Sequence, residues 1–443
     1  MSPRRRRATV LTAATVLSAA AAPVASAAAP AAPVTSVAAS PARTTTSGLP
    51  EGLYGTADPK YDGVWRQSMA LLALDGAKAV PARKAVDWLT GQQCADGSFA
   101  AYRAEPGKKC DPDDTPADIN ATALAVQALA AVGGRSDAVR EGLEWLASVQ
   151  NKDGGWGFGP HADSDANSTS LVIGALHATG RNPAETTVEG GESPYDALLS
   201  FQLTCGSKGI EDAPGAQGAF AYQPDKKGRL APNNDATAAA VLAALGEGAL
   251  PEPPAEDAGN TPVTPLKCAS GADQEKGKGV PGGRKAAAGA GAAHLAATLK
   301  KNGGHFTSVA PGSSDEQPDY ANTADAVVAL AAGGHRDAAA TSLSWLADNL
   351  DKWDKSRKDP AAIGSLMLAS RATGGDPTEL GGTDLLSRLN RTGPKPAKMP
   401  EDEAAEQQDS GAGIPIWAFV LIGLAVGAGF GILLSGRRKR QQP

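Results

Sequence analysis

Two segments of the chain share one pattern, KAVDWLTGQQCADGSF at residues 84–99 and GLEWLASVQNKDGGW at residues 142–156. In both, a Trp-Leu pair is followed after three residues by glutamine, and after three more by glycine, any residue and an aromatic residue. Weaker copies end at Phe220 and Phe306. Self-similarity of this kind over residues 61–392 indicates repeated units that pack on their neighbours.

Each copy begins with a Trp/Leu/Gln segment of helical pattern, and an alanine-rich segment follows its glycine-aromatic loop. The alanine-rich segments close on a glycine, as expected just past a helix C-terminus; these residues are Gly133, Gly180, Gly248 and Gly334. We expect about twelve helices that begin near residues 61, 82, 117, 136, 165, 194, 233, 284, 319, 336, 359 and 376. Six hairpins close a double ring, so the prediction is an all-α (α/α)6 toroid with alanine-rich inner helices, because small side chains let converging helices pack closely.

The segments at 84–99 and 142–156 resemble the QW motif of squalene and terpenoid cyclases. The broader resemblance is to the prenyltransferase/squalene-oxidase repeat, over most of residues 61–392, and it also implies an (α/α)6 toroid. That superfamily includes terpene cyclases, protein prenyltransferase β-subunits, complement thioester domains and vitamin B12 carriers of the intrinsic-factor type. A fold shared so widely does not choose a function.

The first residues have the pattern of a secretory signal peptide. Arg4–Arg7 form a basic region, an apolar stretch runs from Ala8 to about Ala22, and Ala25-Ser26-Ala27 offers a cleavage site. We therefore expect residues 1–27 to be removed on export. The Ala/Pro/Thr-rich segment 28–60 is expected to be disordered.

The last residues predict a membrane anchor. Residues 414–434 are apolar and long enough for a transmembrane helix. Residues 435–443 form a basic tail, which the positive-inside rule places in the cytoplasm. Residues 393–413 are expected to be a linker that tethers an extracellular toroid to the cell membrane by this single span. The alternative for 414–434, a buried core helix, is disfavoured by the flanking charges.

Charge and cysteine content limit the class of binding partner and the redox compartment that we expect for the protein. A net charge of −6 and a pI near 5.5 argue against nucleic acid as a partner. Four cysteines in an exported chain indicate disulfides, although free buried thiols are the alternative. Of the three possible pairings we favour Cys94–Cys110 with Cys205–Cys268, because each closes a loop between successive helices. Cys268 lies in a Pro/Gly-rich stretch, residues 250–283, expected to be a surface insertion.

An acidic run at Asp111, Asp113 and Asp114 spells Asp-x-Asp-Asp-Thr, the pattern in which class II terpene cyclases carry their acid. These three residues are the candidates for catalysis. Against that role, the run lies beside Cys110 and before the helix start that the repeat predicts at Asp118. The alternative is an acidic loop that leads into Thr115 as N-cap, with Asp118 at the third helical position.

The starts of the alanine-rich helices carry a recurrent Asp/Asn/Thr pattern. In a toroid these starts would meet at one mouth and could bind one ligand. Capping of the helices is the alternative for any single residue. The predicted ligand-binding set is Asp118, Asn120, Thr122, Asp165, Asn167, Thr169, Asn233, Asp235, Asp319 and Asn322, with the aromatic residues Tyr102, Phe158 and Tyr222. The loop residues Phe99, Trp156, Phe220 and Phe306 are interpreted instead as structural.

These observations favour a surface protein that binds a bulky small molecule, with a corrinoid as one candidate because export, disulfides and a lone toroid resemble the B12 carriers. Such a protein could pass its ligand to a membrane importer. The β-domain that usually caps the ligand in those carriers is not evident. No zinc-like His/Cys spacing is present, so no metal site is expected. The alternatives are a class II terpene-cyclase-like enzyme, a polysaccharide-active lyase, or a non-catalytic interaction scaffold.

Overall fold

The computed structural model describes residues 49–400 apart from 209, 256, 269–281 and 310–313. This part of the chain forms twelve α-helices. The odd-numbered helices are α1 (Gly63–Gly76), α3 (Ile119–Val132), α5 (Ala166–Ala178), α7 (Asn234–Leu245), α9 (Tyr320–Ala332) and α11 (Pro360–Ala372). The even-numbered helices are α2 (Arg83–Thr90), α4 (Ser136–Ser148), α6 (Pro194–Ser200), α8 (Gly283–Lys301), α10 (Arg336–Asn349) and α12 (Leu385–Asn390).

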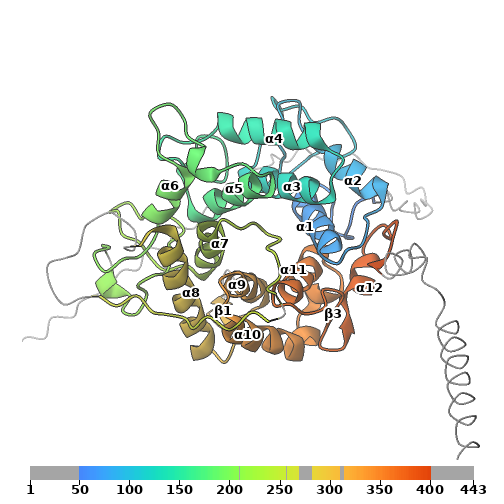
Figure 1. Cartoon of the computed structure of the whole chain (residues 1–443). Helices are drawn as coiled ribbons and strands as arrows, with labels where there is room; N and C mark the ends of the chain where they lie inside the picture. Colours follow the sequence, from blue (N-terminus) through green and yellow to red (C-terminus); the bar gives the residue numbers. More distant parts are fainter. Residues whose placement is uncertain (1–48, 209, 256, 269–281, 310–313, 401–443) are drawn as a thin grey trace, which may run out of the picture. The chain divides into compact units, whose positions relative to one another are not determined.

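The odd-numbered helices form a closed inner ring. Each packs on the next odd-numbered helix, and α11 packs on α1 (Figure 1). Each even-numbered helix lies outside and packs on the inner helix before it in the chain. The predicted toroid of six helical hairpins is therefore confirmed.

The glutamine of the repeat joins each glycine-aromatic loop to the next part of the outer ring. Its Nε2 donates one hydrogen bond to the loop glycine carbonyl and a second to a backbone carbonyl near or within the following outer helix. The pairs of acceptors are Gly97 and Ala138 for Gln93 (both 2.9 Å), Gly154 and Thr186 for Gln150 (2.8 and 3.1 Å), and Gly218 and Ala287 for Gln202 (3.0 and 2.9 Å). The spacing of the motif thus reflects a cross-link between successive repeats.

The loop glycine is required by both its conformation and its surroundings. Gly154 has φ +84°, and a Cβ built on it would lie 2.3 Å from the carbonyl oxygen of Ser193, just before α6. Two residues later, Trp156 is 1% exposed and donates from Nε1 to the carbonyl of Leu146 at 2.8 Å. Phe99, Phe220 and Phe306 are buried in the same way. These four aromatic residues pack in the core of the toroid, as their structural interpretation required.

Residues 49–60, which the sequence assigned to the disordered segment, pack on the toroid. Tyr54 is fully buried, and its hydroxyl donates to the carbonyl of Pro394 at 2.5 Å. Residue 394 belongs to the predicted linker, whose described part, 393–400, also bridges to Val80 through Lys398. A buried tyrosine orders this short segment despite its loop-like composition, since burial of one aromatic side chain contributes about 2–3 kcal/mol.

Three predicted helix boundaries are wrong. The last helix begins at Leu385 instead of near 376, because the strands β3 (Glu379–Leu380) and β4 (Thr383–Asp384) form a tight turn before it. Asp118, and not Thr115, is the N-cap of α3; its Oδ1 accepts from the backbone of Ala121 at 2.6 Å. Helix α7 ends at Leu245 and is capped by Gly246, which has φ +84° and lies two residues before the predicted Gly248.

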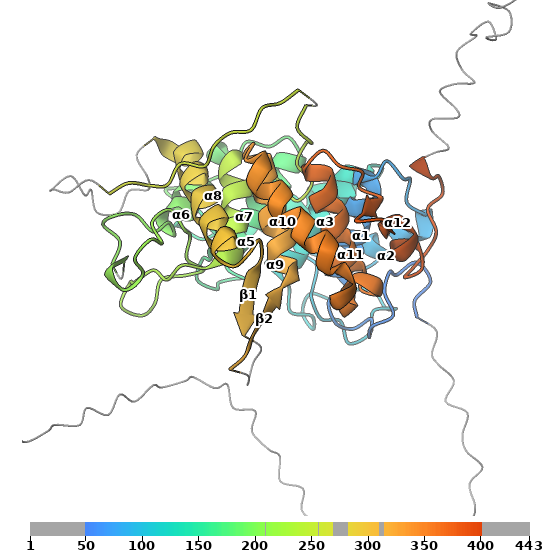
Figure 2. The same ribbon diagram turned by 90° about the horizontal axis from the view of Figure 1, so that it is seen from below.

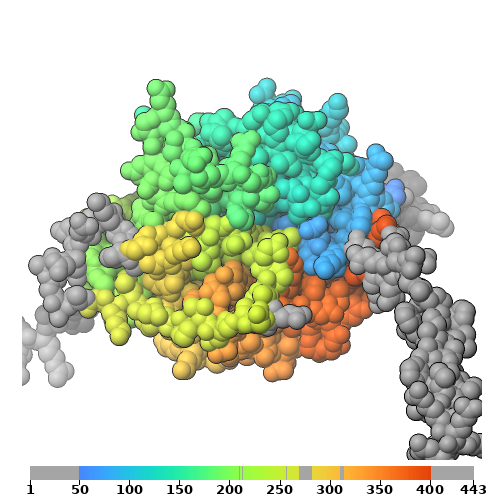
Figure 3. Space-filling model, viewed as in Figure 1, coloured from blue at the N-terminus to red at the C-terminus, as the bar shows by residue number. Residues whose placement is uncertain are grey.

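Two features mark opposite ends of the inner ring (Figure 2). At the end where the inner helices begin, the antiparallel strands β1 (Phe306–Val309) and β2 (Glu316–Asp319) form a hairpin that the sequence did not predict. At the other end, residues 246–255 and 257–261 cross the ring as a segment that we call the strap (Figure 3).

The strap is fixed to three sides of the ring by backbone contacts. The amide of Ala249 donates to Oε1 of Gln127 on α3 at 2.8 Å. Arg371 on α11 donates to the carbonyl of Pro251. The amide of Thr261 donates to the carbonyl of Gly334, beside α10, at 2.8 Å. The first part of the predicted insertion 250–283 is therefore built into the fold.

The predicted signal peptide (1–27), transmembrane helix (414–434) and basic tail (435–443) lie outside the described residues. Among the helices that are described, none combines the length and apolarity that a bilayer crossing requires.

Candidate functional site

The inner ring encloses a cavity of about 1130 Å³ to which all six inner helices contribute. The cavity extends from the beginnings of these helices to strap residues Glu247, Gly248 and Ala249. A volume of this size exceeds the usual 300–1,000 Å³ range of small-molecule pockets. The cavity is therefore the candidate binding site.

The caps and threonines of the helix-start pattern form hydrogen bonds that stabilise the helices and loops of the toroid. Asp118, Asp165, Asn233 and Asp319 are N-caps of α3, α5, α7 and α9, with side chains that accept from the third helical residue. The threonine four residues on is fully buried in each helix, and its Oγ1 accepts from the backbone amide of the loop aromatic residue. These bonds join Thr122 to Phe99 (2.9 Å), Thr169 to Trp156 (3.1 Å), Thr237 to Phe220 (2.9 Å) and Thr323 to Phe306 (3.0 Å). Neither set lines the cavity.

The middle residues of the pattern do line the cavity. Asn120, Asn167 and Asp235 lie two residues after the caps of α3, α5 and α7, and Asn322 lies three residues after the cap of α9. Because adjacent inner helices supply them, the structure brings these four predicted residues to one wall. Their binding role stays a prediction.

Several polar atoms on this wall have no hydrogen-bond partner in the described structure. They are Oδ1 of Asn120, Oδ1 of Asn167 and Oγ of Ser170. Asn167 uses its Nδ2 to donate to Oδ2 of Asp235 at 2.5 Å. Since buried polar atoms are nearly always paired, we treat these atoms as candidates to accept hydrogen bonds from a bound molecule or water.

Asp325 is a site residue that the sequence analysis missed. It follows Asn322 by three residues on α9, so both side chains face the cavity. Burial, together with the charges of Asp235 and Asp319, raises the pKa of Asp325 to about 7. Burial likewise raises the pKa of Asp235, opposed by the hydrogen bond from Asn167. The available signal was an aspartate inside an otherwise alanine- and valine-rich helix.

Three basic residues, Arg66, Lys355 and Lys358, also line the cavity. Arg66 on α1 donates to the carbonyls of Tyr54, Ala57 and Tyr61 at 2.9–3.1 Å. Its guanidinium is therefore hydrogen-bonded to backbone carbonyls. Lys355 and Lys358 lie in the exposed segment before α11. In the described part of the chain, no basic side chain forms an ion pair with Asp235 or Asp325.

The predicted aromatic site residues Tyr102, Phe158 and Tyr222 do not line the cavity. Phe158 is 61% exposed, and the hydroxyl of Tyr222 donates to Oδ2 of the cap Asp165 at 3.3 Å. Tyr102 packs on Tyr61 with ring centroids 4.9 Å apart. The aromatic residues that do line the cavity are Tyr61, Trp65 and Trp353, which the repeat pattern did not single out.

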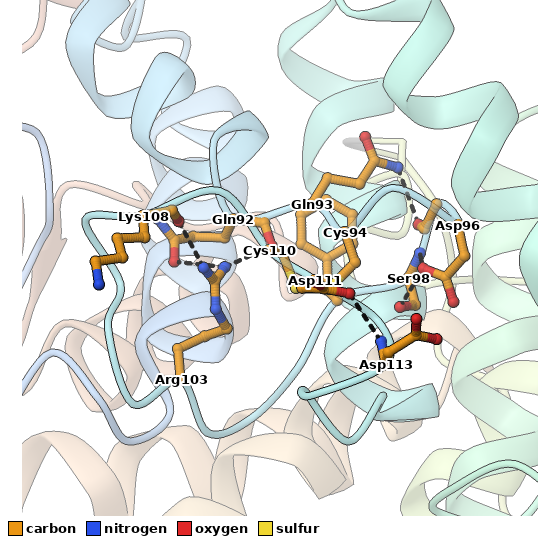
Figure 4. The surroundings of a disulfide bond; sticks show 12 residues. Gln92, Gln93, Cys94, Asp96, Ser98, Arg103, Lys108, Cys110, Asp111 and Asp113 are labelled. Carbon is orange, nitrogen blue, oxygen red and sulfur yellow. Dashed lines mark hydrogen bonds between the residues drawn. A yellow bond between two sulfur atoms is a disulfide. The ribbon is translucent and has the colours of Figure 1, made fainter.

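The acidic run at Asp111, Asp113 and Asp114 lies in an exposed loop and does not line the cavity. The backbone amide of Asp113 donates to Oδ1 of Asp111 at 3.1 Å, a local turn beside the Cys94–Cys110 disulfide (Figure 4). An acid that protonates an alkene must be buried against its substrate. The placement of this run gives no support to that chemistry.

Both favoured disulfides, Cys94–Cys110 and Cys205–Cys268, are formed in the structure. No group of three or more His, Cys, Asp or Glu side chains in the described ranges is arranged to hold a metal ion.

A closed double ring of alternating inner and outer helices defines an α/α-toroid protein. Residues 55–209 match the family described as prenyltransferase alpha-alpha toroid domain, and this match supports membership of the prenyltransferase/squalene-oxidase repeat superfamily. No curated protein sequence matches the chain. A solved structure titled "Crystal structure of a protein from Actinoplanes" is similar, at 16% identity and a TM-score of 0.42 over 73% of this chain and 92% of that chain.

Proposed function

We propose that this toroid binds a bulky small molecule in its central cavity without catalysis, as an exported protein at the cell surface. The observation that carries the proposal is the set of unpaired acceptors Asn120, Asn167 and Ser170 on the wall of a cavity of about 1130 Å³. A scaffold that needs no ligand would gain nothing from such a cavity, since unfilled space and unpaired polar atoms both lower stability.

The proposal also includes the cellular compartment of the protein and the kind of ligand that it binds. Two disulfides favour an oxidising environment, which supports export. The predicted anchor at 414–434 would then hold the toroid outside the membrane, where it could deliver its ligand to an importer. A corrinoid is the first ligand to test because it is bulky and its amide side chains can donate to the cavity acceptors.

Filling the cavity tests the proposal. Ala239 on α7 lines the cavity, whereas Ala147 on α4 is exposed on the outer ring. Ligands are sought with the purified full-length chain by calorimetry against a corrinoid panel and by mass spectrometry of small molecules that co-purify with it. We expect Ala239→Trp to abolish binding of any ligand found and Ala147→Trp to leave it unchanged. A ligand that binds both variants equally would contradict a central site.

A further inference from the structure

Two carboxylates face the cavity from neighbouring helices of the inner ring, Asp235 on α7 and Asp325 on α9. Asp325 has neither a hydrogen-bond nor an ion-pair partner among the residues described, and Asp235 is bonded by the Asn167 amide alone. Two partly buried carboxylates without a cation repel each other and lose hydration. No ion pair within the described residues offsets this cost.

The same wall offers neutral acceptors beside the carboxylates. Ser170 is 5% exposed, lines the cavity, and has an Oγ without a partner. It follows Asn167 by one helical turn, and the unpaired Oδ1 of Asn167 belongs to the amide that contacts Asp235. A ligand group that donates several hydrogen bonds and carries positive charge would satisfy this wall.

From these contacts, and resting on the proposed function, we infer that the ligand carries a protonated amine that binds between Asp235 and Asp325. An ammonium group presents N–H donors and no acceptor, which matches a wall of two carboxylates with Ser170 and Asn167 beside them. The cavity aromatics Trp65 and Trp353 supply apolar faces for the body of the ligand.

A divalent metal fits the wall less well. Oxygen-bound cations such as Ca²⁺ use six to eight ligands, often several of them carboxylates. Over the described residues no cluster of three acidic or other metal-ligating side chains forms here or elsewhere. An ammonium group needs fewer partners, and it needs them at hydrogen-bond distance.

Matched amine and alcohol probes test the inference on the full-length chain. The probes are 1-adamantylamine with 1-adamantanol, and benzylamine with benzyl alcohol, titrated by calorimetry and by thermal shift at pH 8 and low salt. Each pair has nearly the same shape and differs in charge. We expect each amine to bind at least about tenfold more tightly than its alcohol, and added salt to weaken the amine alone.

Substitutions assign the difference to the carboxylates. Asp325→Asn and Asp235→Asn should weaken amine binding about tenfold or more and leave alcohol binding unchanged. The exposed Asp348 on α10 provides the control Asp348→Asn, which should change neither. Circular dichroism verifies that each variant is folded, and Ala239→Trp should block both members of a pair.

The possible failures separate the two proposals. If the alcohols bind as tightly as the amines, and Ala239→Trp blocks both, the amine site is overturned. The proposal that the cavity binds a small molecule then stands. Amine binding that survives both aspartate substitutions would also overturn the amine site, as would the absence of any response to either amine. Binding of MgCl2 or CaCl2 that Asp325→Asn removes would assign the wall to a metal instead. Binding unaffected by Ala239→Trp would overturn the central cavity itself.

Discussion

The repeat copy at 142–156 and the copy that ends at Phe306 form the same loop by different interactions. In the first, Gln150 joins the loop to the next repeat, and Gly154 lies against the Ser193 carbonyl. In the second, Lys300 stands at the glutamine position, while His305 stacks on Trp345 with ring centroids 4.1 Å apart. Hydrogen bonds thus fix the strong copy, and ring packing with the β1–β2 hairpin replaces them in the degenerate copy.

The glycines give the largest expected difference between the copies. Gly154→Ala should destabilise the protein by about 3–5 kcal/mol, because positive φ strain is added to a clash with backbone. At Gly304 a Cβ would meet Trp345 at 3.4 Å, so Gly304→Ala should cost only the φ strain, about 1–2 kcal/mol. Urea unfolding followed by circular dichroism measures both. Equal losses would show that the two loops are equally constrained.

The motif glutamine gives the next largest effect. Gln202 is 2% exposed, and Gln202→Leu removes the two hydrogen bonds that its amide donates to the carbonyls of Gly218 and Ala287 in the core, at a cost of about 2–3 kcal/mol. Lys300→Leu at the corresponding position should change stability by less than about 0.5 kcal/mol. Thermal melts of the two variants test this. A large loss at Lys300 would mean that the last copy has an unrecognised cross-link.

Substitution of the threonines should destabilise the two copies equally. Thr169 and Thr323 both accept from the amide of a buried loop aromatic residue, at 3.1 and 3.0 Å. Replacement of either by valine keeps the shape and loses the hydrogen bond, so each should cost about 1–2 kcal/mol. Differential scanning calorimetry measures the loss of stability in the two valine variants. Unequal losses would show that the threonine contact stabilises the strong copies more than the weaker ones.

Asp325, in the half of the ring that holds the weaker copy ending at Phe306, should give an effect that depends on pH. Its pKa of about 7 lies above the ordinary 3.8, so between these values the folded state holds a proton that the unfolded state has lost. Stability from this group therefore falls as pH rises through that window. Asp325→Asn should match the parent near pH 4 and exceed its stability at pH 8 by up to about 4 kcal/mol, since each unit of pKa shift corresponds to about 1.4 kcal/mol. If the stability of the parent and that of Asp325→Asn change with pH in parallel over this range, the pKa of the carboxylate is not raised.

The sequence was sufficient to predict the ring because the repeat carries its own geometry. The Gln-x3-Gly spacing places a side-chain amide against its own loop, and the threonine four residues after each cap reaches the loop amide. Composition alone would have been less reliable. Helix α8 is as alanine-rich as the inner helices yet lies outside, where Gly291 allows close approach to Val241 of α7.

The candidate site was predicted in part, for a physical reason. Helix periodicity identifies residues that share a face, but it does not say which face meets the cavity and which meets the neighbouring loop. The caps and threonines therefore entered the predicted site together with Asn120, Asn167, Asp235 and Asn322, although only these four line the cavity. Asp325 lies outside the repeated pattern, and Tyr61, Trp65 and Trp353 reach the cavity through contacts that only the closed ring creates.

The strap crosses one end of the ring, and its residues Glu247, Gly248 and Ala249 line the cavity there. If the strap stays in place, we expect a guest to enter and leave at the opposite end, where the inner helices begin. A long polymer could then insert only a chain terminus, and the part of a guest left outside would face a receiver on that side.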